Sequence, residues 1–290
     1  MNLNHFAVIG HPIGHTMSPF IHKRLFELTG HAPEYVVLDV PSIPEKLEVL
    51  RAKDGFNITI PHKSAILPYL DEIDEKAKLF GSVNTVKAEN GHLCGYTTDG
   101  IGCRKALQRF GLDFDGALLI LGRGGAARAI AFEAVLTADA PKIDFACRGE
   151  SMEKAAELCE ELSALCEKQG KTGVFRVLSY DELNAEDTVY DLVLNTTSVG
   201  MYPKTGVSVV GAEVLKRCKA AFDAVYNPGE TEFLRIAKEN GLVAVGGMGM
   251  LVCQAVAAHE IWYGAVFGDS DIERLIADAE AETERVFRSN

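Results

Sequence analysis

The sequence predicts an α/β fold of two domains, in which helices cover sheets of mainly parallel strands. Segments with strand and helix patterns alternate along almost the whole chain, and parallel strands need such crossover helices. The length of 290 residues and the hydrophobic content of 47% suffice for two cores of ordinary size. The alternation breaks only at residues 84–96, shortly before the expected change of domain.

Short apolar or alternating runs predict the strands. Strands are expected at residues 5–9, 34–39, 56–60, 117–121, 143–147, 174–178, 191–195, 221–225 and 242–245. A helix is expected from Ser18 to Thr29, with Ser18 as its N-cap and Pro19 at its first position. Another is expected at 151–170, where the apolar residues form one stripe.

The segment "NTVKAENGHLCGY" predicts a β-hairpin, because Asn90-Gly91 between two β-like runs is a type I′ turn signal. A helix is expected to follow at about 100–110 and to contain the domain change. The first domain is therefore predicted at 1–101, completed by the helical residues 246–290, and the second domain at 102–245.

Composition excludes several classes of partner. The formal net charge of -12 argues against nucleic acid and anionic membranes. No apolar run is long enough for a membrane span, and we expect no secretory signal. Seven scattered cysteines without a C-x-x-C motif are typical of reduced thiols in a cytoplasmic protein. No metal is expected, because a proline and two glycines break the ligand spacing of His11, His15 and His22.

A glycine turn in "ALLILGRGGAARAIAFEA" suggests a nucleotide site. Gly122, Gly124 and Gly125, followed by Ala126, allow backbone N–H groups and a helix N-terminus to approach a pyrophosphate. The usual third glycine is absent, so a tight turn without a ligand is the alternative. The strand before the turn and the helix after it favour the nucleotide.

The next strand, "KIDFAC", ends where a dinucleotide's ribose is normally read. Arg148 there suits a 2′-phosphate and hence NADP, whereas Glu150 suits a free 2′-hydroxyl and hence NAD. Both are alternatively solvated charges at a strand end. Arg148 lies nearer the expected position, which favours NADP.

Polar residues gather in four stretches of the first domain, "GHTMSP", "NITIPHK", "SVNT" and "YTTDG". The hydroxyls of Thr16 and Ser18 can donate to a carboxylate at a helix start. Plain helix capping by Ser18, an N-cap role for Asp99 and a solvated Lys63 are the alternatives.

Together these segments resemble the shikimate dehydrogenases, from Ala7 to past Gln254. The resemblance is carried by "GHPIGHTMSPFIH", "GFNITIPHK", "GSVNT", "TTDGIG", "GRGGAARA", "NTTSVGM", "DAVYNP" and "GMGMLVCQA". It implies a substrate-binding domain followed by a Rossmann-type domain, with C-terminal helices returning to the first. It also implies reversible, NADPH-dependent reduction of 3-dehydroshikimate to shikimate, a step of chorismate and aromatic amino-acid biosynthesis, by a monomer or homodimer.

The resemblance also assigns residues. Lys63 and Asp99 match the family's catalytic pair. Matches to substrate-binding positions are Thr16, Ser18, Asn57, Thr59, Asn84, Tyr226 and Gln254. Matches to cofactor-binding positions are Gly122, Gly124, Gly125, Ala126, Arg148, Thr196, Gly247 and Met250, and Arg123 lies inside the same glycine loop.

Reduction of a ketone explains the polar strand of "GFNITIPHK". The reaction builds negative charge on an oxygen, and Lys63 beyond the strand end can protonate it. Asn57 and Thr59, two apart in the strand, can bond a polyhydroxylated ring, and Asp99 can orient Lys63. The strand is polar on one face because its ligand is polar.

Three departures from the family pattern leave alternatives open. Thr16 stands where serine is usual, Cys147-Arg148-Gly149 replaces Asn-Arg-Thr, and Arg123 is unusual in its loop. The extra methyl of Thr16 narrows the carboxylate pocket, whereas the second and third departures leave use of NAD open, so an NAD-preferring quinate/shikimate dehydrogenase is the nearest alternative. A non-catalytic nucleotide-binding sensor is disfavoured by the catalytic pair, and a methylenetetrahydrofolate-type dehydrogenase by "GHTMSP" and "TTDG".

Overall fold

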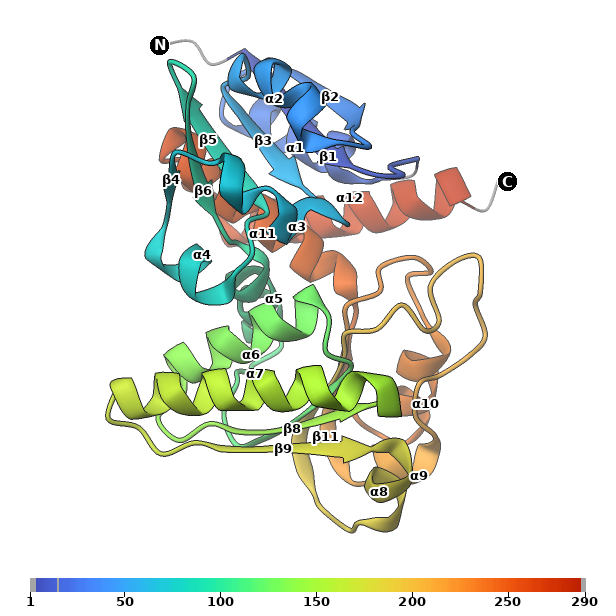
Figure 1. The fold of residues 1–290 in the computed structure, drawn as a ribbon. Helices are drawn as coiled ribbons and strands as arrows, with labels where there is room; N and C mark the ends of the chain where they lie inside the picture. The colour runs from blue at the N-terminus through green and yellow to red at the C-terminus, as the bar shows by residue number, and fades with distance from the viewer. Residues whose placement is uncertain (1–3, 15, 288–290) are drawn as a thin grey trace. The chain divides into compact units, whose positions relative to one another are not determined.

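The computed structural model describes residues 4–14 and 16–287, which form two compact α/β units (Figure 1). The first unit lies within Met1–Asp99 and Val252–Ala279, and the second within Gly100–Leu251 and Glu280–Asn290. The predicted two-domain α/β fold is confirmed, including the return of C-terminal helical residues to the first unit. Within the described ranges, no helix is long and apolar enough to cross a membrane.

The first unit holds a six-stranded sheet of order β2-β1-β3-β5-β6-β4. Its strands are β1 (His5–Gly10), β2 (Glu34–Asp39), β3 (Gly55–Ile58), β4 (Glu72–Ile73), β5 (Thr85–Glu89) and β6 (His92–Tyr96). β1 pairs in parallel with β2 and β3, whereas β5 is antiparallel to both β3 and β6. The predicted type I′ hairpin between β5 and β6 is confirmed, because Asn90 and Gly91 have φ of 54° and 80°.

Helices cover both faces of this sheet. They are α1 (Ser18–Leu28), α2 (Ile43–Arg51), α3 (His62–Ala65), the 3₁₀-helix η1 (Leu67–Tyr69), α4 (Glu75–Phe80), and parts of α11 (Gly247–Tyr263) and α12 (Asp269–Phe287). Phe6 of β1 packs with Phe26 of α1 and Trp262 of α11, whereas the next residue, Ala7, packs with Leu50 of α2 in a separate cluster. Successive strand residues point to opposite faces, so the two clusters lie on opposite sides of the sheet.

Two local predictions are corrected. Ser18 is the first residue of α1 and not its N-cap, which is Met17. Thr16 Oγ1 instead accepts a hydrogen bond from the Ser18 backbone N–H at 3.2 Å, so a hydroxyl two residues earlier satisfies this free donor. The strand expected at 56–60 ends at Ile58, and the side chain of Ile60 is exposed.

The second unit is built on an all-parallel sheet of order β12-β11-β10-β7-β8-β9, as predicted for a Rossmann-type domain. Its strands are β7 (Ala117–Leu121), β8 (Lys142–Cys147), β9 (Val174–Ser179), β10 (Tyr190–Asn195), β11 (Cys218–Asp223) and β12 (Val243–Val245). β11 begins three residues before the predicted 221–225, because Cys218 pairs with Tyr190 at the start of β10.

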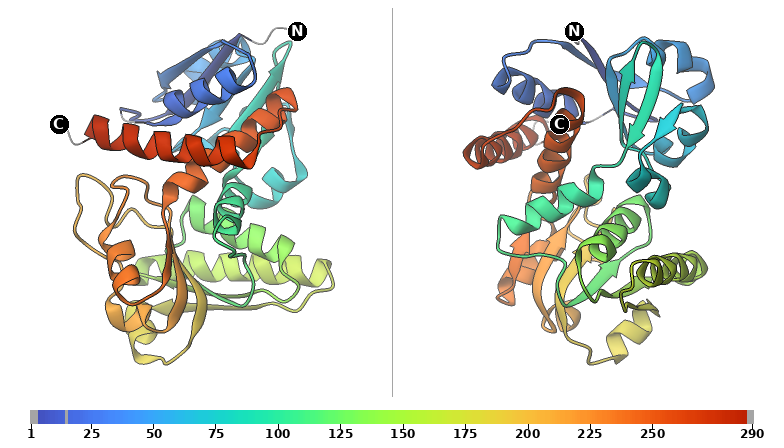
Figure 2. Two further views of the ribbon diagram at one scale, coloured as in Figure 1. Left: turned by 180° about the vertical axis from the view of Figure 1, so that it is seen from behind. Right: turned by 90° about the vertical axis from the view of Figure 1, so that its left-hand side faces the viewer.

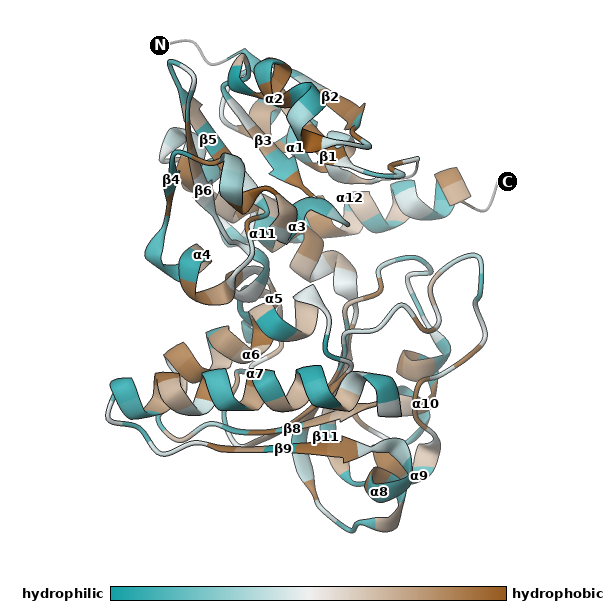
Figure 3. Ribbon diagram, in the orientation of Figure 1, coloured by the Kyte–Doolittle hydropathy of each residue, from teal (hydrophilic) through white to brown (hydrophobic). Residues whose placement is uncertain are grey.

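The helices of the second unit are α5 (Asp99–Gln108), whose first residue belongs to the first unit, α6 (Gly125–Thr137), α7 (Gly149–Lys168), α8 (Tyr180–Ala185), α9 (Ala212–Leu215) and α10 (Glu232–Glu239), together with the start of α11 and the end of α12. α6 and α7 lie side by side on one face of the sheet, and α10 packs on β11 and β12 from the other (Figures 1 and 2). Figure 3 shows hydrophilic and hydrophobic residues alternating along α7, which is typical of a helix with one buried stripe.

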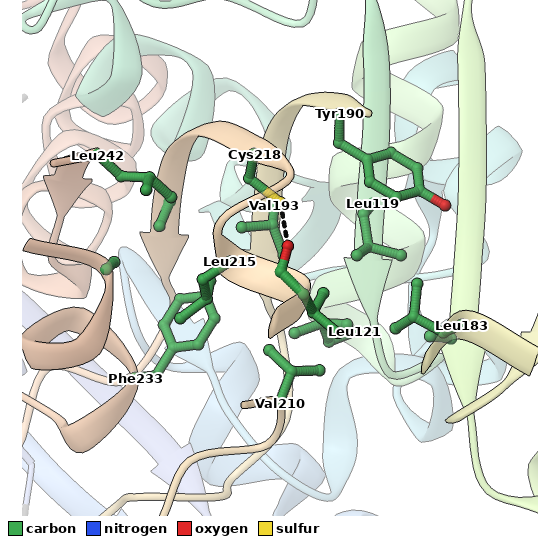
Figure 4. Close-up of a cluster of buried hydrophobic side chains, with 14 of the residues drawn as sticks. Leu119, Leu121, Leu183, Tyr190, Val193, Val210, Leu215, Cys218, Phe233 and Leu242 are labelled. Carbon is green, nitrogen blue, oxygen red and sulfur yellow. Dashed lines mark hydrogen bonds between the residues drawn. The ribbon is translucent and has the colours of Figure 1, made fainter. Parts of the chain in front are cut away.

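A buried apolar cluster holds this sheet against α9 and α10 (Figure 4). Leu119 and Leu121 of β7 and Val193 of β10 pack with Phe233 of α10. The Cys218 thiol is buried there and donates to the carbonyl oxygen of Val214 at 3.4 Å. Apolar side chains therefore cover this face of the sheet.

Candidate active site

An ion pair between Lys63 and Asp99 is the centre of the polar cluster in the first unit. Lys63 is in the short helix α3 that follows β3, and Asp99 is the first residue of α5. Lys63 Nζ lies 2.5 Å from Asp99 Oδ2, with 25% of the lysine side chain and 9% of the aspartate side chain exposed. The ammonium group is thus held by a nearly buried carboxylate while part of its side chain stays open to solvent.

Asn84 joins this pair to the rest of the cluster. Its side-chain amide donates to Asp99 Oδ1 at 2.8 Å and to Thr98 Oγ1 at 2.9 Å, and its Oδ1 accepts from the Thr98 backbone N–H at 2.8 Å. Gln254 of α11 is at the margin of this group, with Oε1 3.5 Å from both Asn84 Nδ2 and Thr98 Oγ1. Each oxygen of Asp99 therefore has its own donor, which fixes the carboxylate in one orientation.

Asn57 on β3 is buried and fully oriented. Its Oδ1 accepts from the Tyr35 hydroxyl at 2.8 Å, and its Nδ2 donates to Thr85 Oγ1 at 3.2 Å. Burial holds the pKa of the Tyr35 phenol well above its ordinary value, so the hydroxyl remains a donor. Thr59 is half-buried one residue beyond the strand, and its backbone N–H donates to Ile9 of β1.

A buried histidine pair lies behind Tyr35. The rings of Tyr35 and His22 are stacked with centroids 4.5 Å apart, and His22 Nδ1 is 3.1 Å from His259 Nε2. Burial lowers the pKa of both imidazoles, and the repulsion that would arise if both rings were protonated adds to this effect on His22. The pair is therefore neutral, and it connects α1 with α11 beneath the polar cluster.

The hydroxyls of Thr16 and Ser18 form a separate pair at the start of α1. Thr16 Oγ1 donates to Ser18 Oγ at 3.1 Å, and both residues are half-buried. Two hydroxyl groups beside a helix N-terminus form a small site suited to a carboxylate, since the helix dipole favours negative charge there.

In the second unit, predicted cofactor residues follow the carboxyl ends of neighbouring parallel strands. Gly122 follows β7, Arg148 follows β8 and Thr196 follows β10. Gly122 has φ of 104°, and a Cβ there would lie 3.1 Å from Thr196 Oγ1, so glycine is required. Thr196 Oγ1 donates to the Leu121 carbonyl oxygen at 2.7 Å, which joins the ends of β10 and β7.

The N-terminus of α6 is open in the way an anion site requires. Its N-cap, Gly124, offers no side-chain hydrogen bond to the first turn, and a Cβ at Gly124 or Gly125 would meet no atom within 4 Å. Ala126 is half-buried on the same turn. Within the described part of the chain, Arg123 Nε is buried without a hydrogen-bond partner, which leaves a donor for a ligand.

The remaining predicted residues also lie in the second unit. Arg148 is the exposed N-cap of α7, and Glu150 is exposed in the first turn of that helix. Tyr226 is half-buried after β11, and burial raises its pKa. Gly247 begins α11 so close to β11 that a Cβ would lie 2.5 Å from the Ala224 carbonyl oxygen, and Met250 is buried one turn later.

Sequence reasoning missed several supporting residues. Thr98 stands within the quoted "YTTDG", yet only the structure shows that it binds Asn84 through both backbone and side chain. Tyr35 and Thr85 reach Asn57 from strands that no motif connects to β3. Thr85 stands within the quoted "SVNT", whereas Tyr35 lies in no quoted motif, and only the folded chain shows that both bind Asn57.

Known proteins share both the sequence and the fold. Residues 8–86 match the family model of the shikimate dehydrogenase substrate binding domain. The shikimate dehydrogenase (NADP(+)) of Methanococcus maripaludis strain C6 is 41% identical over 264 residues, which cover 89% of this chain and 91% of that protein.

Two solved structures extend the similarity. Shikimate 5-dehydrogenase of Thermus thermophilus, crystallised with NADP(H) and shikimate, has a TM-score of 0.82 at 33% identity over 95% of this chain and 99% of its own. The Listeria monocytogenes enzyme, with shikimate and NAD, has a TM-score of 0.79 at 29% identity over 94% and 96%. The resemblance read from the motifs is confirmed, and the chain belongs to the shikimate dehydrogenase family.

Proposed function

We propose that this protein is an NADP-dependent shikimate dehydrogenase that reversibly reduces 3-dehydroshikimate to shikimate in chorismate and aromatic amino-acid biosynthesis. The observation that carries the proposal is the ion pair of Lys63 and Asp99, 2.5 Å apart, within a cluster of oriented hydrogen-bonding side chains. The named activity of the relatives supports it.

Lys63 and Asp99 are the proposed catalytic pair. NADPH, when bound, supplies the hydride. Negative charge then develops on the ketone oxygen, and Lys63 Nζ stabilises that charge and donates a proton to the oxygen. Asp99 holds the ammonium in place and, in the reverse direction, favours return of the proton to Lys63. Asn84 donates to the other oxygen of Asp99 and so keeps the pair aligned.

The substrate is held by groups that match its chemistry. Thr16 and Ser18 are proposed to donate to the substrate carboxylate at the start of α1. The proposed partners of the ring hydroxyls and walls of the pocket are Asn57, Thr59, Asn84, Tyr226 and Gln254. The orientation of Asn57 by Tyr35 and Thr85 supports this, because a preset amide loses little freedom when a ligand binds.

The first unit is proposed as the substrate-binding and catalytic domain, and the second as the NADP-binding domain. The open N-terminus of α6 and the unpartnered Arg123 Nε fit a pyrophosphate. Residues proposed to line the cofactor are Gly122, Arg123, Gly124, Gly125, Ala126, Arg148, Thr196, Gly247 and Met250. We also propose a cytoplasmic location, which the free cysteines support, and a monomer or homodimer.

NAD is the second candidate cofactor. Arg148 is exposed and can pair with a 2′-phosphate, but Cys147 is buried and Gly149 has no side chain, so neither adds a polar group. Glu150 is exposed on the next turn and can accept from a free 2′-hydroxyl. The Listeria monocytogenes relative, crystallised with NAD, supports keeping this alternative.

An initial-rate matrix of shikimate and quinate against NADP and NAD tests the proposal. We expect the highest kcat/KM for shikimate with NADP. The variant Arg148→Ala should raise KM for NADP about tenfold or more while NAD kinetics stay unchanged. Lys154→Ala, an exposed charge further along α7, is the matched control. A higher kcat/KM with NAD than with NADP would show that the protein is an NAD-dependent dehydrogenase. The absence of turnover with every pair of substrate and cofactor would refute the proposed enzymatic function.

A further inference from the structure

A cluster of three potential metal ligands lies at one edge of the first sheet, outside the proposed active site. Glu72 is on the two-residue edge strand β4 and pairs in register with Cys94 of β6. His92 precedes Cys94 by two residues on β6, so both side chains point to the same face. A carboxylate, an imidazole and a thiol are thereby placed side by side by strand geometry alone.

The distances suit a tetrahedral ion. Glu72 Oε2 is 3.6 Å from Cys94 Sγ and 3.7 Å from His92 Nε2, and all three ligand atoms lie within 4.8 Å of one another. Zinc bonds of about 2.0–2.3 Å in a tetrahedron keep such atoms about 3.3–3.6 Å apart. Only small side-chain rotations are needed, and Glu72 and His92 are exposed enough to make them.

The surrounding charge favours a cation. Glu89 stands opposite His92 on β5, and Lys87, opposite Cys94, is paired with Glu89 at 2.9 Å. One lysine therefore faces two carboxylates.

We propose that Glu72, His92 and Cys94 bind one zinc ion, with solvent as the fourth ligand. The mixture of sulfur, nitrogen and oxygen donors suits zinc and other thiophilic divalent ions better than magnesium or calcium, which take oxygen ligands. The ion joins β4 to β6. That edge also has two paired residues, backbone hydrogen bonds from the Asp71 N–H to the Leu93 carbonyl oxygen at 3.0 Å and from the Asp74 N–H to the Gly95 carbonyl oxygen at 2.9 Å, and the Asp71 carboxylate, which accepts from the Leu93 backbone N–H at 2.8 Å. The role is structural, because none of these residues belongs to the proposed catalytic cluster.

Titration of the untagged, reduced, metal-free protein with zinc chloride tests the proposal, together with cobalt(II) as a spectroscopic probe. We expect one equivalent of zinc to bind, and the cobalt form to show a thiolate-to-metal charge-transfer absorption. Cys94→Ser should abolish that absorption and weaken zinc binding at least tenfold, and His92→Ala should weaken it similarly. Cys159→Ser, at a half-exposed cysteine of α7, is the control and should change neither.

Two results overturn the site. One is the absence of saturable zinc binding up to about 0.1 mM, a weak affinity for a specific site. The other is a thiolate absorption that survives Cys94→Ser, since the ligand would then be another cysteine. Shikimate oxidation rates of the zinc-loaded and metal-free forms should agree within a factor of two, because the ion lies outside the catalytic cluster.

Discussion

Removal of the Asn84 amide tests the network that supports the proposed catalytic pair. In Asn84→Ala, the Thr98 backbone N–H and Asp99 Oδ1 each lose a partner at 2.8 Å, and both residues are almost fully buried. An unsatisfied buried group costs about 1–3 kcal/mol, and more when it is charged. The two losses sum to about 2–6 kcal/mol, and a water molecule entering the vacated polar space returns part of this. We expect a net loss of about 2–4 kcal/mol, a large share of an ordinary domain's stability.

Urea unfolding of the purified variant measures this loss, and steady-state kinetics measure its consequence. We expect kcat to fall at least tenfold, because Asp99 loses one of the two donors that orient it. Asn240→Ala is the matched control, since its half-buried amide makes one bond of 2.8 Å to the Ile236 carbonyl oxygen. That substitution should cost about 1 kcal/mol and leave kcat unchanged. The reasoning is refuted if Asn84→Ala unfolds within 1 kcal/mol of wild type and keeps its turnover.

Two further predictions concern the buried histidines and the substrate carboxylate. His22 and His259 stay neutral in the folded protein, whereas unfolded histidines bind protons below about pH 6.5. Their contribution to the free energy of unfolding is therefore fully present above about pH 6.5 and is lost as the pH drops below it. In urea titrations between pH 7 and 5, His259→Phe should reduce the slope, by up to about 1.4 kcal/mol per pH unit toward pH 5, where an unfolded histidine is almost fully protonated; an unchanged slope would show that His259 is not buried as a neutral group. Ser18→Ala should raise KM for shikimate about 10- to 150-fold at nearly constant kcat, and an unaltered KM would place the carboxylate elsewhere.

The motifs identify the candidate catalytic and binding residues, but not the residues that orient them. Period-two patterns and glycine turns predicted both sheets and the hairpin at Asn90, because these features depend on neighbouring residues. Ser18 is predicted as an N-cap, but α1 begins one residue earlier than that prediction requires, with Met17 as its N-cap. The hydroxyl of Thr16 accepts from the Ser18 backbone N–H, and the sequence does not show which of the two hydroxyl groups takes this role. β4 is not predicted, because a strand of two residues is too short to show an alternation of polar and apolar residues.

The missing parts of the candidate site are long-range contacts. Tyr35 orients Asn57 across 22 residues of sequence, and His22 meets His259 across 237. Neither contact has a local pattern, because strand order and helix packing create them only in the folded chain. The proposed metal ligands share this origin, since β4 and β6 bring Glu72 beside Cys94.

The central claim is that Lys63 protonates the reacting oxygen, and Lys63→Met tests it most directly. Methionine keeps much of the side-chain volume but removes the ammonium that lies 2.5 Å from Asp99. Steady-state kinetics of 3-dehydroshikimate reduction should show kcat lowered by about 10²–10⁴-fold, with KM for the substrate within a few fold of wild type. A variant that retains a tenth or more of wild-type kcat would contradict the account.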